Sequence, residues 1–156
     1  MHEQFPVYAL DIIGNGSIPR LRDNKICGIF GVHSKFRLSV QQLSFLYDAM
    51  RTGTVRGQDG FGLYGLDNDR KSVNAIKMAG NPYDMFKMPA FAGYSKWMDQ
   101  SASLVVGHHR AATKGKSSDQ NAHPFNEGHI TLVHNGTLTD GIDMKKFEVD
   151  SEGICH

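Results

Sequence analysis

Four clusters of glycine beside charged or nucleophilic residues stand out in this chain. They are residues 27–28 (CG), 56–60 (RGQDG), 107–110 (GHHR) and 134–136 (HNG). Glycine lets the backbone approach a bound molecule or another strand closely. Thiol, guanidinium and amide groups can attack, bind and polarise a small polar substrate. Four such clusters in 156 residues therefore predict a built site.

Cys27 begins a short apolar segment and is followed by Gly28. One interpretation is a thiol nucleophile on a rigid strand, with room for a substrate above the glycine. The other is a small buried hydrophobic residue, which is the commonest role of a lone cysteine. The residue types alone leave both interpretations open.

Charged and amide groups elsewhere could complete such a site. Arg110 is followed by small residues, which leave its guanidinium room for a carboxylate, although a surface arginine is the alternative. Asn135 and Gly136 offer a side-chain amide beside an unobstructed backbone N–H, the donor pair of an oxyanion hole, or else a hairpin turn. Asp150 could bind an ammonium group or lie in a solvated acidic loop.

Five of the eight histidines lie between positions 108 and 134. Strand alternation sends His108 and His109 to opposite faces of a sheet, and the chain has no HExxH or CxxC spacing. We therefore expect no metal site, and no organic cofactor is implied.

The elements that must position these groups follow from hydrophobic periodicity and turn residues. Ser39 can cap a helix, and residues 67–70 form a polar hairpin loop. Residues 139–147 stay ambiguous. The predicted elements are strands at 26–33, 61–66, 72–78, 103–109 and 129–134, a helix at 39–50, a helix at 83–98 broken near Pro89, and a polar loop at 113–127. This order predicts an α+β domain rather than a doubly wound parallel sheet.

Composition restricts the class of protein. Lys and Arg total 17 against 16 Asp and Glu, so the chain lacks the basic excess of nucleic-acid-binding proteins. Two cysteines exclude a disulfide-rich secreted scaffold, and no apolar stretch approaches the roughly 20 residues of a membrane helix. Residues 1–26 resemble no export signal. We expect a soluble, cytoplasmic protein with one domain, preceded by a leader at 1–26.

Taken in order, the motifs resemble the glutaminase domain of class II glutamine amidotransferases, which are N-terminal nucleophile hydrolases. The resemblance covers residues 27–156 and rests on six stretches: 27–31 (CGIFG), 56–62 (RGQDGFG), 107–115 (GHHRAATKG), 121–125 (NAHPF), 134–136 (HNG) and 150–152 (DSE). The fold it implies is a four-layer α-β-β-α sandwich, of which the C-terminal part is expected to be missing here.

The resemblance also implies a reaction. Cys27 would attack the side-chain amide of L-glutamine, release ammonia and form a thioester that water hydrolyses to glutamate. Asn135 and Gly136 would form the oxyanion hole. The alternatives are a non-catalytic glutamine-binding module and an amidase with another substrate.

Four further residues acquire roles through the same resemblance. Arg110 would bind the α-carboxylate of glutamine and Asp150 its α-ammonium group, while Arg56 and His123 would complete the substrate pocket. The ammonia acceptor would be bound by a separate synthase chain or domain, and the sequence does not identify it.

One feature departs from the family pattern. There the catalytic cysteine is the first residue, and its α-amine, with a pKa near 7.7–8.0, is the general base. Here the amide bond between Ile26 and Cys27 removes that base. We expect removal of a propeptide before Cys27, with a different start or loss of activity as the alternatives.

Overall fold

The computed structural model describes residues 26–69, 71–138 and 146–156. A four-stranded sheet forms its centre, in the spatial order β1-β4-β2-β3. Its strands are β1 (Gly28–His33), β2 (Gly60–Asp67), β3 (Val73–Ala79) and β4 (Ala102–Arg110). All pairings within this sheet are antiparallel. The prediction of a mixed α and β domain without a doubly wound parallel sheet is therefore confirmed.

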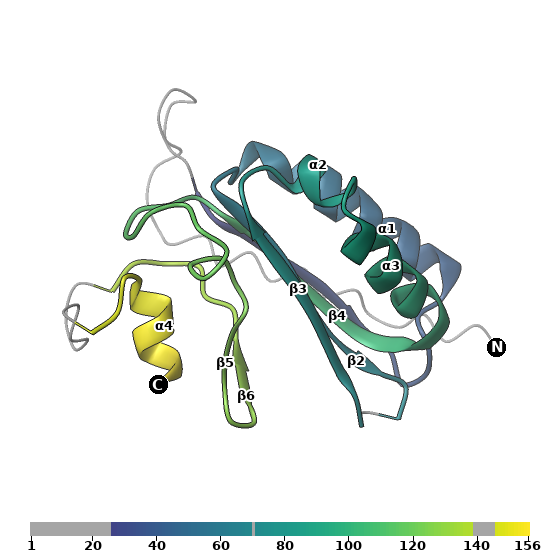
Figure 1. The fold of residues 1–156 in the computed structure, drawn as a ribbon. Helices are drawn as coiled ribbons and strands as arrows, with labels where there is room; N and C mark the ends of the chain where they lie inside the picture. Colours follow the sequence, from purple (N-terminus) through teal and green to yellow (C-terminus); the bar gives the residue numbers. More distant parts are fainter. Residues whose placement is uncertain (1–25, 70, 139–145) are drawn as a thin grey trace, which may run out of the picture.

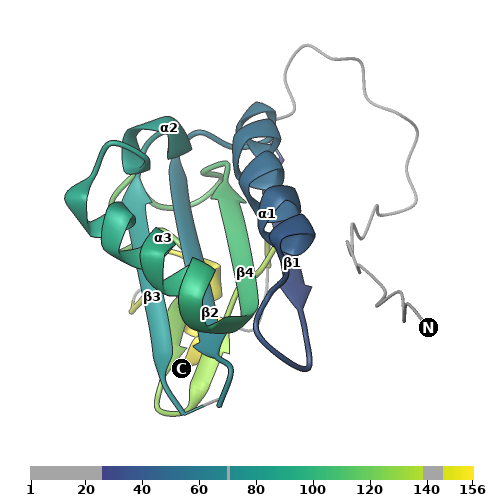
Figure 2. The same ribbon diagram turned by 90° about the vertical axis from the view of Figure 1, so that its right-hand side faces the viewer.

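Three helices cover one face of the sheet: α1 (Val40–Thr52), α2 (Pro82–Met85) and α3 (Pro89–Ser101) (Figures 1 and 2). Ser39 caps α1 as predicted: its side chain accepts from Gln42 N, and Oε1 of Gln42 accepts from Ser39 N in return, which completes a capping box. A 3-10 turn, η1 (Gly53–Val55), follows α1. The broken helix predicted at 83–98 is two helices, α2 and α3. Pro89 is the first residue of α3, since proline suits the first helical turn.

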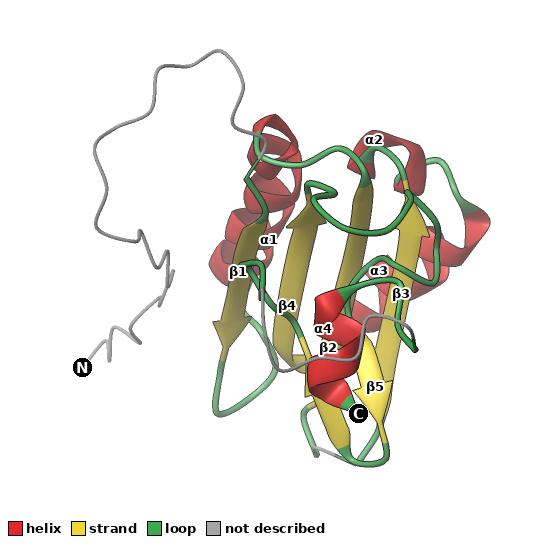
Figure 3. Cartoon of the chain, turned by 90° about the vertical axis from the view of Figure 1, so that its left-hand side faces the viewer, coloured by secondary structure: helices red, strands yellow, loops and turns green. Residues whose placement is uncertain are grey.

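The other face of the sheet carries a small hairpin and a short helix (Figures 1 and 3). The hairpin pairs β5 (Phe125–Glu127) with β6 (Ile130–Leu132), and the helix is α4 (Asp150–Cys155). The segment predicted as a loop at 113–127 thus ends in strand β5. The strand predicted at 129–134 is observed as the shorter β6. Residues 150–152 lie in α4, so the alternative that Asp150 lies in a solvated acidic loop is wrong.

The main core lies between the sheet and α1, α2 and α3. Its side chains include large residues that are fully buried: Leu46, Met50, Phe61, Leu63, Met85, Met98 and Val105. Gly107 belongs to this core rather than to a substrate site. A Cβ at Gly107 would lie 2.0 Å from Cζ of Phe30, so the ring of Phe30 occupies the space above the glycine.

Two predicted segments fall largely outside the described residues. They are the leader, of which only Ile26 is described, and the ambiguous segment 139–147, of which 139–145 are not described. None of the helices in the described ranges has the length and hydropathy needed to cross a bilayer.

The two histidines at the end of β4 point to opposite faces, as predicted. His109 lies on the helix side, packed against the rings of Phe30 and Phe61, and its Nε2 donates to the carbonyl of Ala49 at 3.3 Å. His108 lies on the other side, where its Nε2 donates to the carbonyl of His134 at 3.0 Å. Burial lowers the pKa of His109 to about 4, so its ring is neutral in the folded protein at neutral pH.

This burial predicts a pH-dependent stability. The folded pKa of His109 lies below its unfolded value of 6.5, so its contribution is complete above pH 6.5 and is lost as the pH falls towards 4. The shift of the pKa from 6.5 to about 4 corresponds to about 3 kcal/mol of unfolding free energy. In urea unfolding at several pH values, His109→Gln should lose less unfolding free energy between pH 6.5 and 4 than the parent chain.

The exposed His129 provides the matched control. His129→Gln should retain the pH dependence of the parent chain. Equal pH dependence in His109→Gln and the parent would contradict the assignment of His109 as a neutral core residue.

Candidate active site

A small pocket, whose empty volume of about 280 Å³ includes open solvent, lies where the ends of β1 and β4 meet the segments around His134 and α4. It contains five of the residues that the sequence proposed for a site: Cys27, Arg110, His123, Gly136 and Asp150. The sequence predicts no role of their own for its remaining lining residues, although all but Val149 lie in the stretches named above: Ala111, Thr113, Lys114, His134, Val149 and Ser151.

The thiol of Cys27 faces the backbone of Ala111, just beyond β4. Its Sγ accepts from Ala111 N at 3.3 Å and lies 3.4 Å from Ala111 O, to which a protonated thiol donates. Burial raises the pKa of the Cys27 thiol, although the Ala111 contact and the nearby Arg110 charge oppose this. The thiol is therefore protonated at neutral pH and needs a base before it can act as a nucleophile.

The carbonyl oxygen of Cys27 accepts two hydrogen bonds from distant parts of the chain. Arg56 donates to it through Nε at 3.2 Å, and Asn135 donates through Nδ2 at 3.0 Å. Asn135 is thereby held beside Cys27. Arg56 also lines a neighbouring cavity together with Phe30, Phe45 and His109.

Arg110 is buried, and loop carbonyls hold its guanidinium. Its Nη1 donates to Lys116 O at 3.1 Å and its Nη2 to Lys114 O at 2.5 Å. Burial lowers its pKa, while Cys27, Asp59 and Asp150 oppose this shift. A guanidinium carries five N–H donors, so two bonds to the loop are compatible with a third partner in the pocket.

Asp150 opens α4 and is also buried. Its Oδ2 accepts from Leu138 N at 2.6 Å and its Oδ1 from Ser151 N at 2.9 Å. Each carboxylate oxygen can accept a further bond. The pocket thus presents a cation from β4 and an anion from α4, each held by backbone groups.

Three imidazole rings gather at the pocket. The rings of His108 and His123 have centroids 3.9 Å apart, and Nδ1 of His134 lies 3.1 Å from Oγ of Ser151. Burial lowers the pKa of His123 to about 3. Within the described part of the chain, neither ring nitrogen of His123 has a hydrogen-bond partner. An orphaned imidazole in a pocket is typical of a site that binds a polar ligand.

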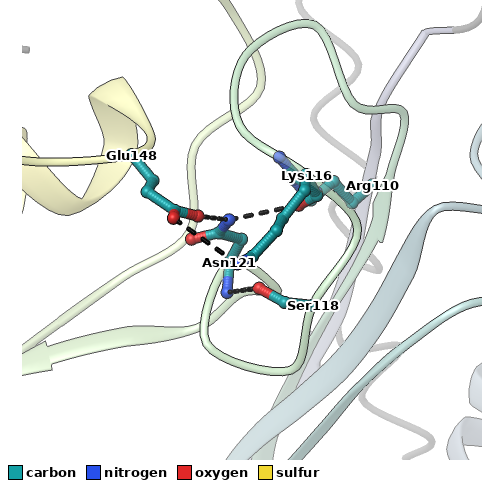
Figure 4. A network of polar contacts seen from close by, with 5 residues as sticks. All are labelled: Arg110, Lys116, Ser118, Asn121 and Glu148. Carbon is teal, nitrogen blue, oxygen red and sulfur yellow. Dashed lines mark hydrogen bonds and ion pairs between the residues drawn. The ribbon is translucent and has the colours of Figure 1, made fainter.

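A network around Asn121 fixes the loop that follows Arg110 (Figure 4). Nδ2 of Asn121 donates to Lys116 O at 3.1 Å and to the carboxylate of Glu148 at 2.6 Å. Lys116 O is also the acceptor for Arg110. Asn121 therefore connects the loop holding Arg110 to the segment that leads into Asp150. The sequence placed Asn121 in a motif but did not assign it this structural role.

Glycine is required where the 56–60 turn meets β4. A Cβ at Gly57 would lie 2.5 Å from the carbonyl carbon of Arg110 and 2.8 Å from Ala111 N. Because both neighbours are backbone atoms, neither can yield easily. Asp59 supports the same junction, since its Oδ2 accepts from Ala112 N at 2.9 Å. Among the described residues, no group of three or more His, Cys, Asp or Glu side chains could hold a metal ion.

Comparisons with known proteins match this chain to one family. The family model "Glutamine amidotransferases class-II" matches residues 26–153. The glutamine–fructose-6-phosphate aminotransferase (isomerizing) of Wigglesworthia glossinidia brevipalpis is 34% identical over 141 residues, which cover 84% of this chain and 22% of that protein. The amidophosphoribosyltransferase of Methanocaldococcus jannaschii is 29% identical over 132 residues, which cover 82% of this chain and 26% of that protein. The chain thus spans about a quarter of these relatives or less.

The hydrogen bonds of Asn121 predict that its replacement by the isosteric aspartate lowers the unfolding free energy strongly. Asn121→Asp removes both Nδ2 donations and places a second carboxylate against Glu148 in a buried position. The unfolding free energy should fall by about 3 kcal/mol at pH 7. The loss should be smaller at pH 5, where the coupled carboxylates take up a proton.

Asn126→Asp is the matched control. Asn126 is exposed on β5, and its Oδ1 accepts from the Thr131 hydroxyl, which an aspartate also allows. Urea unfolding should find this variant within about 0.5 kcal/mol of the parent. A similar loss in both variants would show that Asn121 has no special structural role.

Proposed function

The chain belongs to the class II glutamine amidotransferases, and from this premise we propose that its Cys27 pocket hydrolyses the side-chain amide of L-glutamine. The observation that carries the proposal is the pocket itself. It joins a thiol, a buried guanidinium and a buried carboxylate in one open cavity. Free glutamine carries an amide, a carboxylate and an ammonium group that match these three.

The proposed substrate orientation follows from charge. The α-carboxylate of glutamine pairs with Arg110, and its α-ammonium group donates to Asp150. The ring of His123 lines the pocket and packs against the substrate there. Arg56 acts indirectly, by holding the carbonyl of Cys27.

In the proposed reaction, the deprotonated Sγ of Cys27 attacks the amide carbon of glutamine. Asn135 Nδ2 and Gly136 N–H donate to the developing oxyanion. An amide group has two N–H donors, so Asn135 can bind the Cys27 carbonyl with one and the oxyanion with the other. The C–N bond then breaks, the nitrogen takes a proton and leaves as ammonia, and water hydrolyses the thioester to glutamate and a free thiol.

The base for this reaction is proposed to be the α-amine of Cys27, freed by cleavage after Ile26. The raised pKa of the thiol creates the need for a base. Ile26 is 43% exposed, and its N–H donates to Arg56 O at 3.1 Å. Exposure of the bond to be cut favours processing. Residues 1–26 are therefore proposed as a propeptide, ahead of a glutaminase domain at 27–156.

We further propose the four-layer arrangement of the N-terminal nucleophile hydrolases. The helices α1 to α3, the main sheet, the β5-β6 hairpin and α4 follow one another in space and supply members of each layer (Figure 1). The ammonia is proposed to pass to an acceptor bound by a synthase domain or chain. Two relatives bear the names of an aminotransferase and a phosphoribosyltransferase, which supports a transfer reaction.

Ammonia release from L-glutamine tests the proposal. The chain beginning at Cys27 should release ammonia and glutamate in equal amounts, while Cys27→Ala in that chain should lose activity on the order of 10³-fold or more. Cys155→Ala, at the other free cysteine, should keep the parent rate. Intact mass of the full chain should reveal a species that starts at Cys27.

Each alternative has its own outcome. Glutamine binding without ammonia release by any form indicates a non-catalytic module. Release of ammonia from another amide but not from glutamine indicates a different amidase. Activity that survives Cys27→Ala would falsify the role of the thiol.

Substitutions in the two halves of the pocket should separate binding from chemistry. Asn135→Ala should lower kcat by about 10²- to 10³-fold with little change in KM. Asp150→Asn, which keeps one of the two oxygens that accept from Leu138 N and Ser151 N, should raise KM by about 10- to 100-fold through the loss of the charged partner. Steady-state kinetics measure both, and an unchanged KM in Asp150→Asn would contradict the substrate orientation.

A further inference from the structure

Lys77, on β3, binds three backbone carbonyls of one segment. Its Nζ donates to Gln120 O at 3.2 Å, Ala122 O at 3.0 Å and Pro124 O at 3.0 Å. An ammonium group has three N–H donors, and here each has a carbonyl acceptor. The ammonium also lies 4.9 Å from the centroid of the Phe125 ring. The half-buried lysine is thus fitted to the backbone of residues 120–125.

The sheet beside Lys77 is shaped to receive the same segment. Gly62 on β2 pairs with Lys77, and a Cβ at Gly62 would lie 1.8 Å from the carbonyl oxygen of His123. The segment therefore rests directly on the sheet backbone. Ala79 N also donates to the side chain of Asp119 at 2.7 Å. The contacts made by Gly62, Lys77 and Ala79 fix the segment along β2 and β3.

The residue between the clamped carbonyls is His123. Its ring turns away from the sheet contact towards His108 and lines the Cys27 pocket. It is 4% exposed, and its nitrogens have no partner within the described residues. Among the described residues no hydrogen bond holds this ring, so its position depends on the backbone that carries it and on its packing against the rings of His108 and Phe125.

We propose that Lys77 is a positioning residue, which clamps residues 120–124 to the sheet and so fixes the ring of His123 where it meets the substrate. The inference rests on the proposed function for the identity of that substrate, L-glutamine. Lysine suits this role because its three donors converge on carbonyls from one point. The planar fork of arginine cannot converge in this way.

Lys77→Met tests the clamp, since it keeps an unbranched side chain and removes the three donors. In the chain processed at Cys27, KM for L-glutamine should rise about tenfold while kcat changes less than about twofold. Lys87→Met is the matched control, because Lys87 is exposed and pairs only at the surface with Asp84. It should retain the parent KM and kcat.

A second readout does not depend on turnover. In the full chain labelled with ¹³C-histidine, the ring signals of His123, assigned by their loss in His123→Gln, should shift or broaden in Lys77→Met and stay unchanged in Lys87→Met. If Lys77→Met does not fold, Lys77→Arg replaces it, with the same direction of change expected in both readouts.

The possible outcomes distinguish the proposed function from the proposed role of Lys77. A parent chain that releases no ammonia contradicts the proposed function, and the His123 signals then still decide whether Lys77 places the ring. Unchanged His123 signals, or an unchanged KM in an active parent background, overturn the role of Lys77. A fall in kcat without a rise in KM overturns it as well.

Discussion

The carbonyl oxygen of Cys27 is the point on which the site depends. It accepts from Arg56, 29 residues away, and from Asn135, 108 residues away. These two bonds bring the turn after α1 and the loop before α4 to the end of β1, while the thiol meets Ala111 beyond β4. Backbone atoms therefore define the position of the Cys27 thiol, and side chains from remote segments are oriented around them.

Backbone groups also keep the two charged residues of the pocket apart. Arg110 donates to the carbonyls of Lys114 and Lys116, and Asp150 accepts from the N–H groups of Leu138 and Ser151. A direct ion pair would neutralise both groups and close the pocket. Because each charge is held by the backbone instead, the space between them can accept a molecule that carries both a carboxylate and an ammonium group.

Residue types and periodicity predicted the main sheet, the capped helix and the opposite faces of His108 and His109. They did not predict α4, because its six residues include Gly153 and have no side-chain N-cap, so local propensity is weak. Packing of Val149 and Cys155 against Phe125 stabilises it instead. Likewise the motifs named Cys27, Arg110 and Asp150 as site residues, but not Lys77 or the Asn121 bonds to Lys116 and Glu148, which depend on contacts between distant segments.

The protonation of the pocket bears on how the proposed reaction could start. Burial raises the pKa of the Cys27 thiol and lowers the pKa of His123 to about 3, so the thiol holds its proton and this imidazole is a weak base. His108 is more deeply buried, with its pKa lowered further by His123, and it donates to a carbonyl. His134 is turned towards Ser151 and Gly136. An α-amine on Cys27 itself has the basicity that the rings of His108 and His123 lack, and it lies next to the thiol by covalent geometry. Cleavage after Ile26 would therefore create the base.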